Sequence, residues 1–108
     1  DRLHFEFNKR LYQIPYRDIV YMESRRRVIH LFGRNGEEYR FYKKMKDLLE
    51  EISHTGNMFI RVHCSYVVNY YYIKSLSSTE AELLTGEKLP VSGEYKNEAL
   101  KKFMGMME

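Results

Sequence analysis

The residues best suited to chemistry lie in one strand-like run, FIRVHCSYVVN, which extends from Phe59 to Asn69. Most of its residues are apolar and belong in a core. Arg61, His63, Ser65 and Asn69 do not, unless each finds a polar partner, because an unpaired buried donor costs about 1–3 kcal/mol. We therefore expect the run to lie at the rim of a core, with one side packed and the other presenting hydrogen-bonding groups. The alternative is a strand end whose polar groups only satisfy the local backbone.

Catalysis and metal binding have few candidate residues. Cys64 follows His63, but neighbouring side chains on a strand point to opposite faces, so the base for a thiol would have to come from another histidine. The sequence has no Gly-x-Ser-x-Gly elbow, no Gly-rich phosphate loop and no clustered acidic pair. Four scattered histidines and one cysteine lack the spacing of metal ligands. We expect no enzyme, no metal site and no cofactor.

Nucleic-acid binding is better supplied with residues. Arg25, Arg26 and Arg27 would project three guanidinium groups from a hairpin tip, and arginine suits both phosphates and the guanine edge. Ser92 and the free backbone N–H groups at the start of the last helix could hold a phosphate, with Lys96 adding positive charge. The alternative for the arginines is an ordinary solvated turn.

The charge is distributed unevenly along the chain. The net charge is +3, but residues 1–46 hold twelve Lys and Arg against six Asp and Glu, whereas residues 47–108 carry a net charge of −3. A basic half suggests a surface that faces a polyanion. No apolar run approaches the roughly 20 residues that span a bilayer, so we expect no membrane partner. The single cysteine excludes an intrachain disulfide and fits a reducing compartment.

The periodicity predicts a mostly β domain with two helices. Strands are expected at Leu3–Phe7, Leu11–Ile14, Ile19–Ser24, Val28–Phe32, Glu38–Tyr42, Ile73–Ser77, Glu82–Thr85 and Lys88–Val91, in addition to the Phe59–Asn69 run. Asn35-Gly36 predicts a type I′ turn. The 3.6-residue period predicts one helix over Lys43–Ile52 and another over Glu94–Met107, with Ser92 as the N-cap of the second. Many short strands at regular spacing favour a sandwich or a barrel-like arrangement.

Together these segments resemble the LytTR DNA-binding domain, the output domain of LytR/AlgR-like bacterial response regulators. The resemblance is carried by DIVYMES, GEEYRFY, KMKDLLEEI, FIRVHCSYVVNYYYI and LPVSGEYKNEAL, which occur in the family's order and cover nearly all 108 residues. The central pattern, Phe-x-Arg-x-His-x-Ser-Tyr-x-Val-Asn, is long and specific.

The resemblance implies an assembly of short antiparallel sheets that contacts DNA through loops rather than through a recognition helix. Three loops would face the duplex, and their residues are Arg25, Arg26 and Arg27; His63, Cys64 and Ser65; and Ser92, Gly93, Glu94 and Lys96. Arg61 and Asn69 also match the motif, and they either hold these loops in place or contact DNA directly.

The implied function is sequence-specific binding of duplex DNA by the effector domain of a cytoplasmic transcriptional regulator. We expect residues 1–108 to be a single domain excised from a longer chain with an N-terminal receiver or other regulatory domain, and a homodimer on DNA stays open. The sequence departs from the family in two places: Cys64 stands where a basic or amide residue is usual, and Gly93-Glu94 stands where the pair is commonly basic, often with Arg. A carboxylate cannot make the bidentate guanine contact of an arginine, although it can accept from cytosine N4. The alternative is a protein-interaction module whose DNA contacts have decayed.

Overall fold

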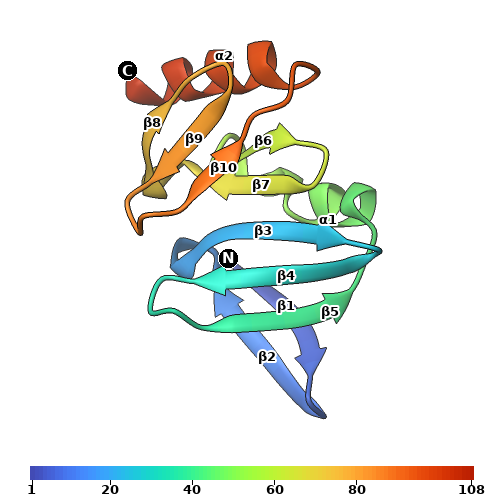
Figure 1. The fold of residues 1–108 in the computed structure, drawn as a ribbon. Coiled ribbons are helices and arrows are strands. Elements are labelled where there is room, and N and C mark those ends of the chain that lie inside the picture. Colours follow the sequence, from blue (N-terminus) through green and yellow to red (C-terminus); the bar gives the residue numbers. More distant parts are fainter.

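A five-stranded antiparallel sheet forms the middle layer of the computed structural model, which describes residues 1–108 (Figure 1). Its strand order is β5-β4-β3-β7-β6, and it lies between a two-stranded sheet, β1-β2, and a three-stranded sheet, β10-β9-β8. The strands are β1 (Arg2–Phe7), β2 (Arg10–Pro15), β3 (Ile19–Arg25), β4 (Val28–Gly33), β5 (Glu38–Tyr42), β6 (Phe59–His63), β7 (Tyr66–Asn69), β8 (Ile73–Leu76), β9 (Glu80–Leu83) and β10 (Lys88–Pro90). The helices are α1 (Met45–Glu51) and α2 (Lys96–Met107), with 3₁₀ turns η1 (Tyr16–Asp18), η2 (Ser53–Thr55) and η3 (Tyr70–Tyr72).

The middle sheet has a separate hydrophobic core on each face. Thirteen buried residues fill the core that includes residues of β1 and α1, and eleven fill the core that includes residues of the third sheet and α2. The adjacent Val67 and Val68 of β7 belong one to each core. Coverage of both faces explains why β3 begins with four consecutive buried apolar residues instead of alternating with polar ones.

The predicted fold class is confirmed, and so is the amphipathic helix before the central motif. In α1 and at its end, Met45, Leu48 and Ile52 are buried, as the helical period predicts. The sequence left a sandwich and a barrel-like arrangement as alternatives. The structure has stacked sheets and no closed barrel, because β5 and β6 are the edges of the middle sheet and do not pair with each other.

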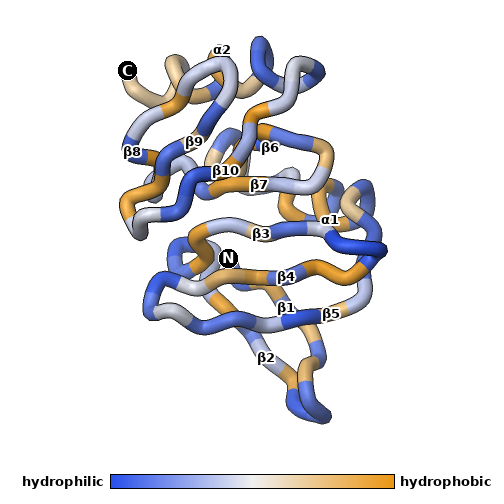
Figure 2. The backbone as a smooth tube through the Cα atoms, in the orientation of Figure 1, coloured by the Kyte–Doolittle hydropathy of each residue, from blue (hydrophilic) through white to orange (hydrophobic).

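Two of the hairpins have tight turns of the same kind. Phe7 pairs with Arg10 and Arg25 pairs with Val28, so each turn has only two residues. All four of these turn residues have positive φ, at 52° and 61° for Asn8 and Lys9 and at 50° and 67° for Arg26 and Arg27. Positive φ at both positions is the type I′ geometry, which matches the right-handed twist of the flanking strands. Figure 2 shows the second of these turns, between β3 and β4, as a hydrophilic segment.

The type I′ turn predicted at Asn35-Gly36 is wrong. Of these two residues only Gly36 has positive φ, at 86°. The strand β4 ends at Gly33 and β5 begins at Glu38, so residues 34–37 connect the strands, which is too long for a two-residue turn. The backbone closes instead through Gly36 N–H donating to Gly33 O and Gly33 N–H donating to Glu37 O.

The last helix begins later than predicted. Its first residue is Lys96 rather than Glu94, and Ser92 does not cap it through its side chain, because the Ser92 hydroxyl has no hydrogen-bond partner. The Ser92 carbonyl accepts instead from the N–H groups of Tyr95 and Lys96, which closes a turn before the helix. The strand predicted at Glu82–Thr85 lies at Glu80–Leu83, because the Ser77 hydroxyl accepts from Thr79 and Glu80 N–H and starts the strand earlier.

Candidate nucleic-acid interface

The three segments expected to face DNA lie side by side at one end of the middle sheet. Ser24, the residue before the last of β3, donates its N–H to Ser65 O at 2.9 Å, which joins the β3–β4 tip to the β6–β7 turn. Ser92 donates its N–H to Val62 O at 3.0 Å, which joins the segment before α2 to β6. Figure 1 shows the three segments on the same side of the molecule, at the right of the view. The structure thus brings together residues from 24 to 96 in the chain.

The arginine triplet is divided between a strand and a turn. Arg25 is the last residue of β3, and its Nη2 donates to Glu23 Oε1 at 2.8 Å. Arg26 and Arg27 form the turn itself, are exposed, and make no side-chain hydrogen bond or ion pair. Alternation along β3 places Arg25 on the same face as Glu23, and the joint projection of the three guanidinium groups stays a prediction.

The β6–β7 turn favours one tautomer of its histidine. Ser65 N–H donates to His63 Nδ1 at 3.1 Å, so Nδ1 is an acceptor and the proton of the neutral ring lies on Nε2. The exposed Cys64 Sγ lies 3.5 Å from the same Nδ1. This proximity was not predicted, and it arises because Cys64 is in a turn, where the alternation of a strand does not apply. His63 Nε2–H is left as a hydrogen-bond donor.

Arg61 holds this turn and the segment before α2 against each other. Its Nε donates to His63 O at 3.3 Å and its Nη2 donates to Cys64 O at 2.9 Å. Its guanidinium carbon also lies over the Tyr95 ring, 4.5 Å from the centroid. Two N–H groups of Arg61 and one face of its guanidinium therefore contact two of the three segments. These contacts favour a positioning role for Arg61 over direct contact with DNA.

Asn69 supports the sheet from inside the core. Its side chain is fully buried and donates to Tyr16 O at 3.3 Å and to Ile19 O at 2.9 Å, while its Oδ1 accepts from Tyr71 N–H at 3.0 Å. These bonds tie the end of β7 to the start of β3. The full burial of Asn69 argues against direct contact with DNA, and its bonds lie at the end of the middle sheet away from the three predicted loops, so it holds the sheet rather than those loops.

The segment before α2 offers backbone donors beside an acidic side chain. The N–H groups of Gly93 and Glu94 donate no hydrogen bond within the chain, and both residues are exposed. The Glu94 carboxylate has no partner, and Lys96 is half-buried in the first turn of α2. An anion near this segment would meet two free N–H groups at a helix start, together with one repulsive carboxylate.

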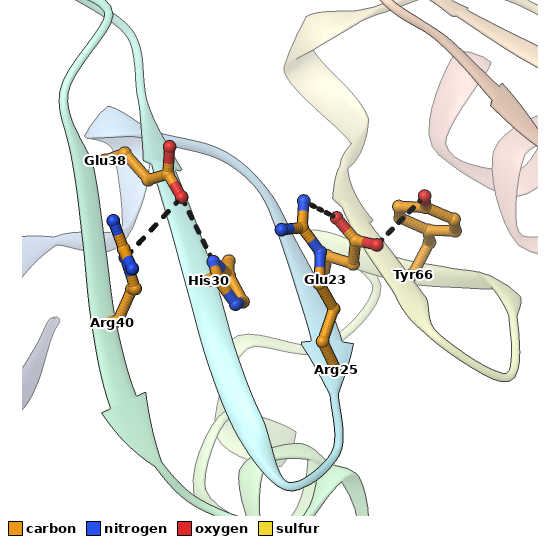
Figure 3. A network of polar contacts seen from close by, with 6 residues as sticks. All are labelled: Glu23, Arg25, His30, Glu38, Arg40 and Tyr66. Carbon is orange, nitrogen blue, oxygen red and sulfur yellow. Dashed lines mark hydrogen bonds and ion pairs between the residues drawn. The ribbon is translucent and has the colours of Figure 1, made fainter.

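Two residues of the site escaped the sequence-based prediction, and Figure 3 shows them with their neighbours. Glu23 Oε2 accepts from the Tyr66 hydroxyl at 3.2 Å, across neighbouring strands β3 and β7. The hydrogen bond from Arg25 is the main reason that the pKa of Glu23 lies below its usual value, so its carboxylate stays ionised. The two-residue spacing of Glu23 and Arg25 was the available signal, because residues i and i+2 share a strand face.

The β4–β5 hairpin adds further polar and cationic groups next to the arginine turn. Lys43 donates its N–H to Arg27 O at 3.0 Å, and Lys44, which follows it, is exposed. Tyr42, paired with Val28, is 87% exposed. On the same strands, His30 Nδ1 lies 3.0 Å from Glu38 Oε2 (Figure 3). The side chain of Lys43 is paired with Glu51, so the exposed Lys44 is the residue that adds an unpaired positive charge at the start of α1.

The sequence model of one protein family, described as the LytTr DNA-binding domain, matches residues 9–104. The chain belongs to the LytTR family. A solved structure described as the LytTr DNA-binding domain of a response regulator from Bacillus cereus matches this LytTR domain with a TM-score of 0.76. The two chains are 21% identical and each is covered over 96% of its length, a likeness that establishes the fold. No curated protein matches the chain in sequence.

The family is one of DNA-binding domains and not of enzymes. The structure of this LytTR domain contains no group of three or more His, Cys, Asp or Glu side chains that could hold a metal ion. Neither of its two α-helices has the length and apolar character needed to cross a lipid bilayer.

Proposed function

We propose that this LytTR domain binds duplex DNA in a sequence-dependent manner, as the effector domain of a bacterial transcriptional response regulator. The contacts would come from the β3–β4 tip, the β6–β7 turn and the segment before α2. The observation that carries the proposal is that hydrogen bonds between backbones hold these three segments together at one end of the middle sheet. A polyanion lying across that end would reach all three at once.

The chemistry of the surface suits a phosphate backbone at its edges. Arg26 and Arg27 are exposed and unpaired, so their guanidinium groups can each meet a phosphate without first breaking an ion pair. The N–H groups of Gly93 and Glu94 add uncharged donors at the opposite edge of the surface. Contacts of this type set register and orientation on the duplex, but they do not read its sequence.

Sequence recognition would fall to the residues between these edges. His63 Nε2–H and the Ser65 hydroxyl can donate to a base edge, and Cys64 is exposed beside them. Glu94 belongs to a pair that resemblance to the family leads us to expect to be basic, and its carboxylate can accept from cytosine N4 but not donate to guanine. We infer a base preference that differs from that of the family at the position facing Glu94, worth about 1–3 kcal/mol of discrimination.

Binding of labelled duplexes at increasing salt concentration tests the proposal directly. The logarithm of the affinity should fall linearly with the logarithm of the salt concentration, and Arg27→Ala should reduce that slope by about 0.9, the value of one phosphate contact. Arg17→Ala is the matched control, because Arg17 is an exposed arginine in η1, before the start of β3 and so at the opposite end from Arg27. Equal effects of the two variants would mean that only diffuse charge is measured.

A protein-interaction module on the same fold is the second candidate, and the unpaired Glu94 carboxylate on the proposed DNA surface favours it. Selection of duplexes from a random-sequence pool, carried out with the wild type and with Glu94→Arg, separates the two functions. A sequence enriched by the wild type supports DNA recognition. Enrichment by Glu94→Arg alone would identify a domain whose DNA contacts have decayed.

A further inference from the structure

Glu23 is an acidic residue at the basic end of the middle sheet, two residues before Arg25 and three before the arginine turn. Its side chain is only 14% exposed, and both of its carboxylate oxygens are occupied. Oε1 accepts from Arg25 Nη2 at 2.8 Å, and Oε2 accepts from the Tyr66 hydroxyl at 3.2 Å (Figure 3). Because Arg25 stabilises its ionised form, the residue brings a full negative charge to a surface that would face phosphates.

A negative charge in that place opposes DNA binding unless it performs another task. Each exposed charge of the same sign as the ligand lowers the local attraction for it. The Arg25 side chain remains 54% exposed, and a guanidinium has five N–H donors, so the bond to Glu23 leaves donors that point to solvent. An arginine that is already held loses less conformational freedom when it binds a ligand. The bond to Glu23 therefore orients Arg25 and leaves other N–H donors of its guanidinium available to a ligand.

The second carboxylate oxygen extends the connection to another segment of the interface. Tyr66 is the first residue of β7, and its ring packs edge-to-face on His63, with the centroids 5.5 Å apart. Next to this contact, Ser24 N–H donates to Ser65 O. A continuous series of contacts thus runs from Arg25 through Glu23 and Tyr66 to His63, and it crosses from the β3–β4 tip to the β6–β7 turn.

We propose that Glu23 is a positioning residue for DNA binding, which holds Arg25 in a phosphate-contacting orientation and sets that arginine in register with the His63 turn. This inference rests on the proposed DNA-binding function. The proposal predicts that removal of the negative charge of Glu23 from the surface weakens the binding of DNA.

A double-mutant cycle between Glu23→Gln and Arg25→Ala tests the inference. The probes are the tightest duplex selected from a random pool and an unselected random-sequence duplex, titrated at several salt concentrations with the 108-residue chain. With Arg25 present, Glu23→Gln should weaken binding about two- to fivefold, the range that exposed ion pairs of this kind span. With Arg25 replaced by alanine, the same change should leave binding unchanged or strengthen it, because only the repulsive charge is then removed.

The other outcomes overturn the inference in distinguishable ways. Stronger binding in both backgrounds would show that Glu23 acts only as a repulsive charge. Equal weakening in both backgrounds would show a general structural role that does not pass through Arg25. Glu37→Gln, in the turn at the opposite end of β4, is the control for charge removal and should change the affinity little.

A second variant keeps the test valid if Glu23→Gln does not fold. Tyr66→Phe removes only the hydroxyl that anchors Oε2, and it should weaken binding when Arg25 is present but not in the Arg25→Ala background. An equal effect in both backgrounds would overturn the linkage. Absence of any salt-dependent DNA binding by the wild type would instead contradict the proposed function itself, before the cycle is interpreted.

Discussion

The arginine turn between β3 and β4, which we propose contacts DNA, should reduce the stability of the fold. Arg26 and Arg27 have φ of 50° and 67°, in the left-handed region that residues with a Cβ adopt at a cost of about 1–2 kcal/mol each. Asn-Gly is the pair best suited to a type I′ turn. We therefore expect the double substitution Arg26→Asn/Arg27→Gly to stabilise the domain.

The size of the gain follows from the two opposing terms. Glycine at position 27 removes the cost of the left-handed backbone conformation. It also loses more conformational freedom on folding than other residues, which destabilises the folded state by about 0.5–1 kcal/mol. With a smaller gain from asparagine at position 26, the net stabilisation is about 1 kcal/mol, which raises the Tm of a domain of this size by about 4–8 °C. Thermal unfolding followed by circular dichroism measures this shift directly.

The same substitution should weaken DNA binding, since it removes two unpaired guanidinium groups. If each neutralises a phosphate, the slope of log affinity against log salt falls by about 1.8 in total. Lys9→Gly is the control for stability, because Lys9 occupies the same position of the other type I′ turn, with φ of 61°. A lower Tm for the double variant, or an unchanged salt slope, would refute the reasoning on stability or on binding respectively.

Three further predictions concern buried and paired groups within the domain. Asn69→Ala should destabilise the domain by about 2–4 kcal/mol in urea unfolding, because Ile19 O and Tyr71 N–H lose the side chain that bonds them and Tyr16 O keeps only its bond from Ile19 N–H; a loss below about 1 kcal/mol would contradict the internal role of Asn69. Burial raises the pKa of Tyr21 to about 12, so the folded state keeps a proton that the unfolded state loses near pH 10, and stability should fall between pH 10 and 12 by up to about 2–3 kcal/mol. Tyr21→Phe should flatten this fall, and identical alkaline profiles would count against it. The pKa of Glu23 is lowered by Arg25, so its contribution to stability is complete above pH 4.5 and is lost as the pH falls below that value; acid unfolding of Glu23→Gln should therefore be shallower than that of the wild type.

The sequence was most informative where local patterns have a local physical cause. The period of two in Leu3, Phe5 and Phe7 and the helical spacing of Met45, Leu48 and Ile52 follow from which face is buried, and both elements form as predicted. The order of the motifs along the chain predicted the family, and the family match over residues 9–104 confirmed it. The roles of individual residues on DNA stay predictions.

Turn geometry and helix starts were harder to predict, because they depend on strand register. Asn35-Gly36 has the best composition for a type I′ turn, yet the pairing of Phe32 with Glu38 leaves a longer connection there. Arg26-Arg27 has a poor composition for that turn, yet the pairing of Arg25 with Val28 imposes it. Register is set by the burial of a whole strand face, which outweighs the preference of two turn residues.

By itself the sequence determined the mostly β class, the amphipathic helix, the basic half and the motif around His63. Only the tertiary structure decided that Ser24 meets Ser65, that Ser92 meets Val62, and that Glu23 reaches Tyr66 forty-three residues away. Hydrogen bonds between segments so far apart form only after the sheets have packed, because burial of two cores supplies the free energy that closes the long loops between them. No local periodicity encodes which backbone groups then face each other, and the arrangement of the interface is a product of that packing.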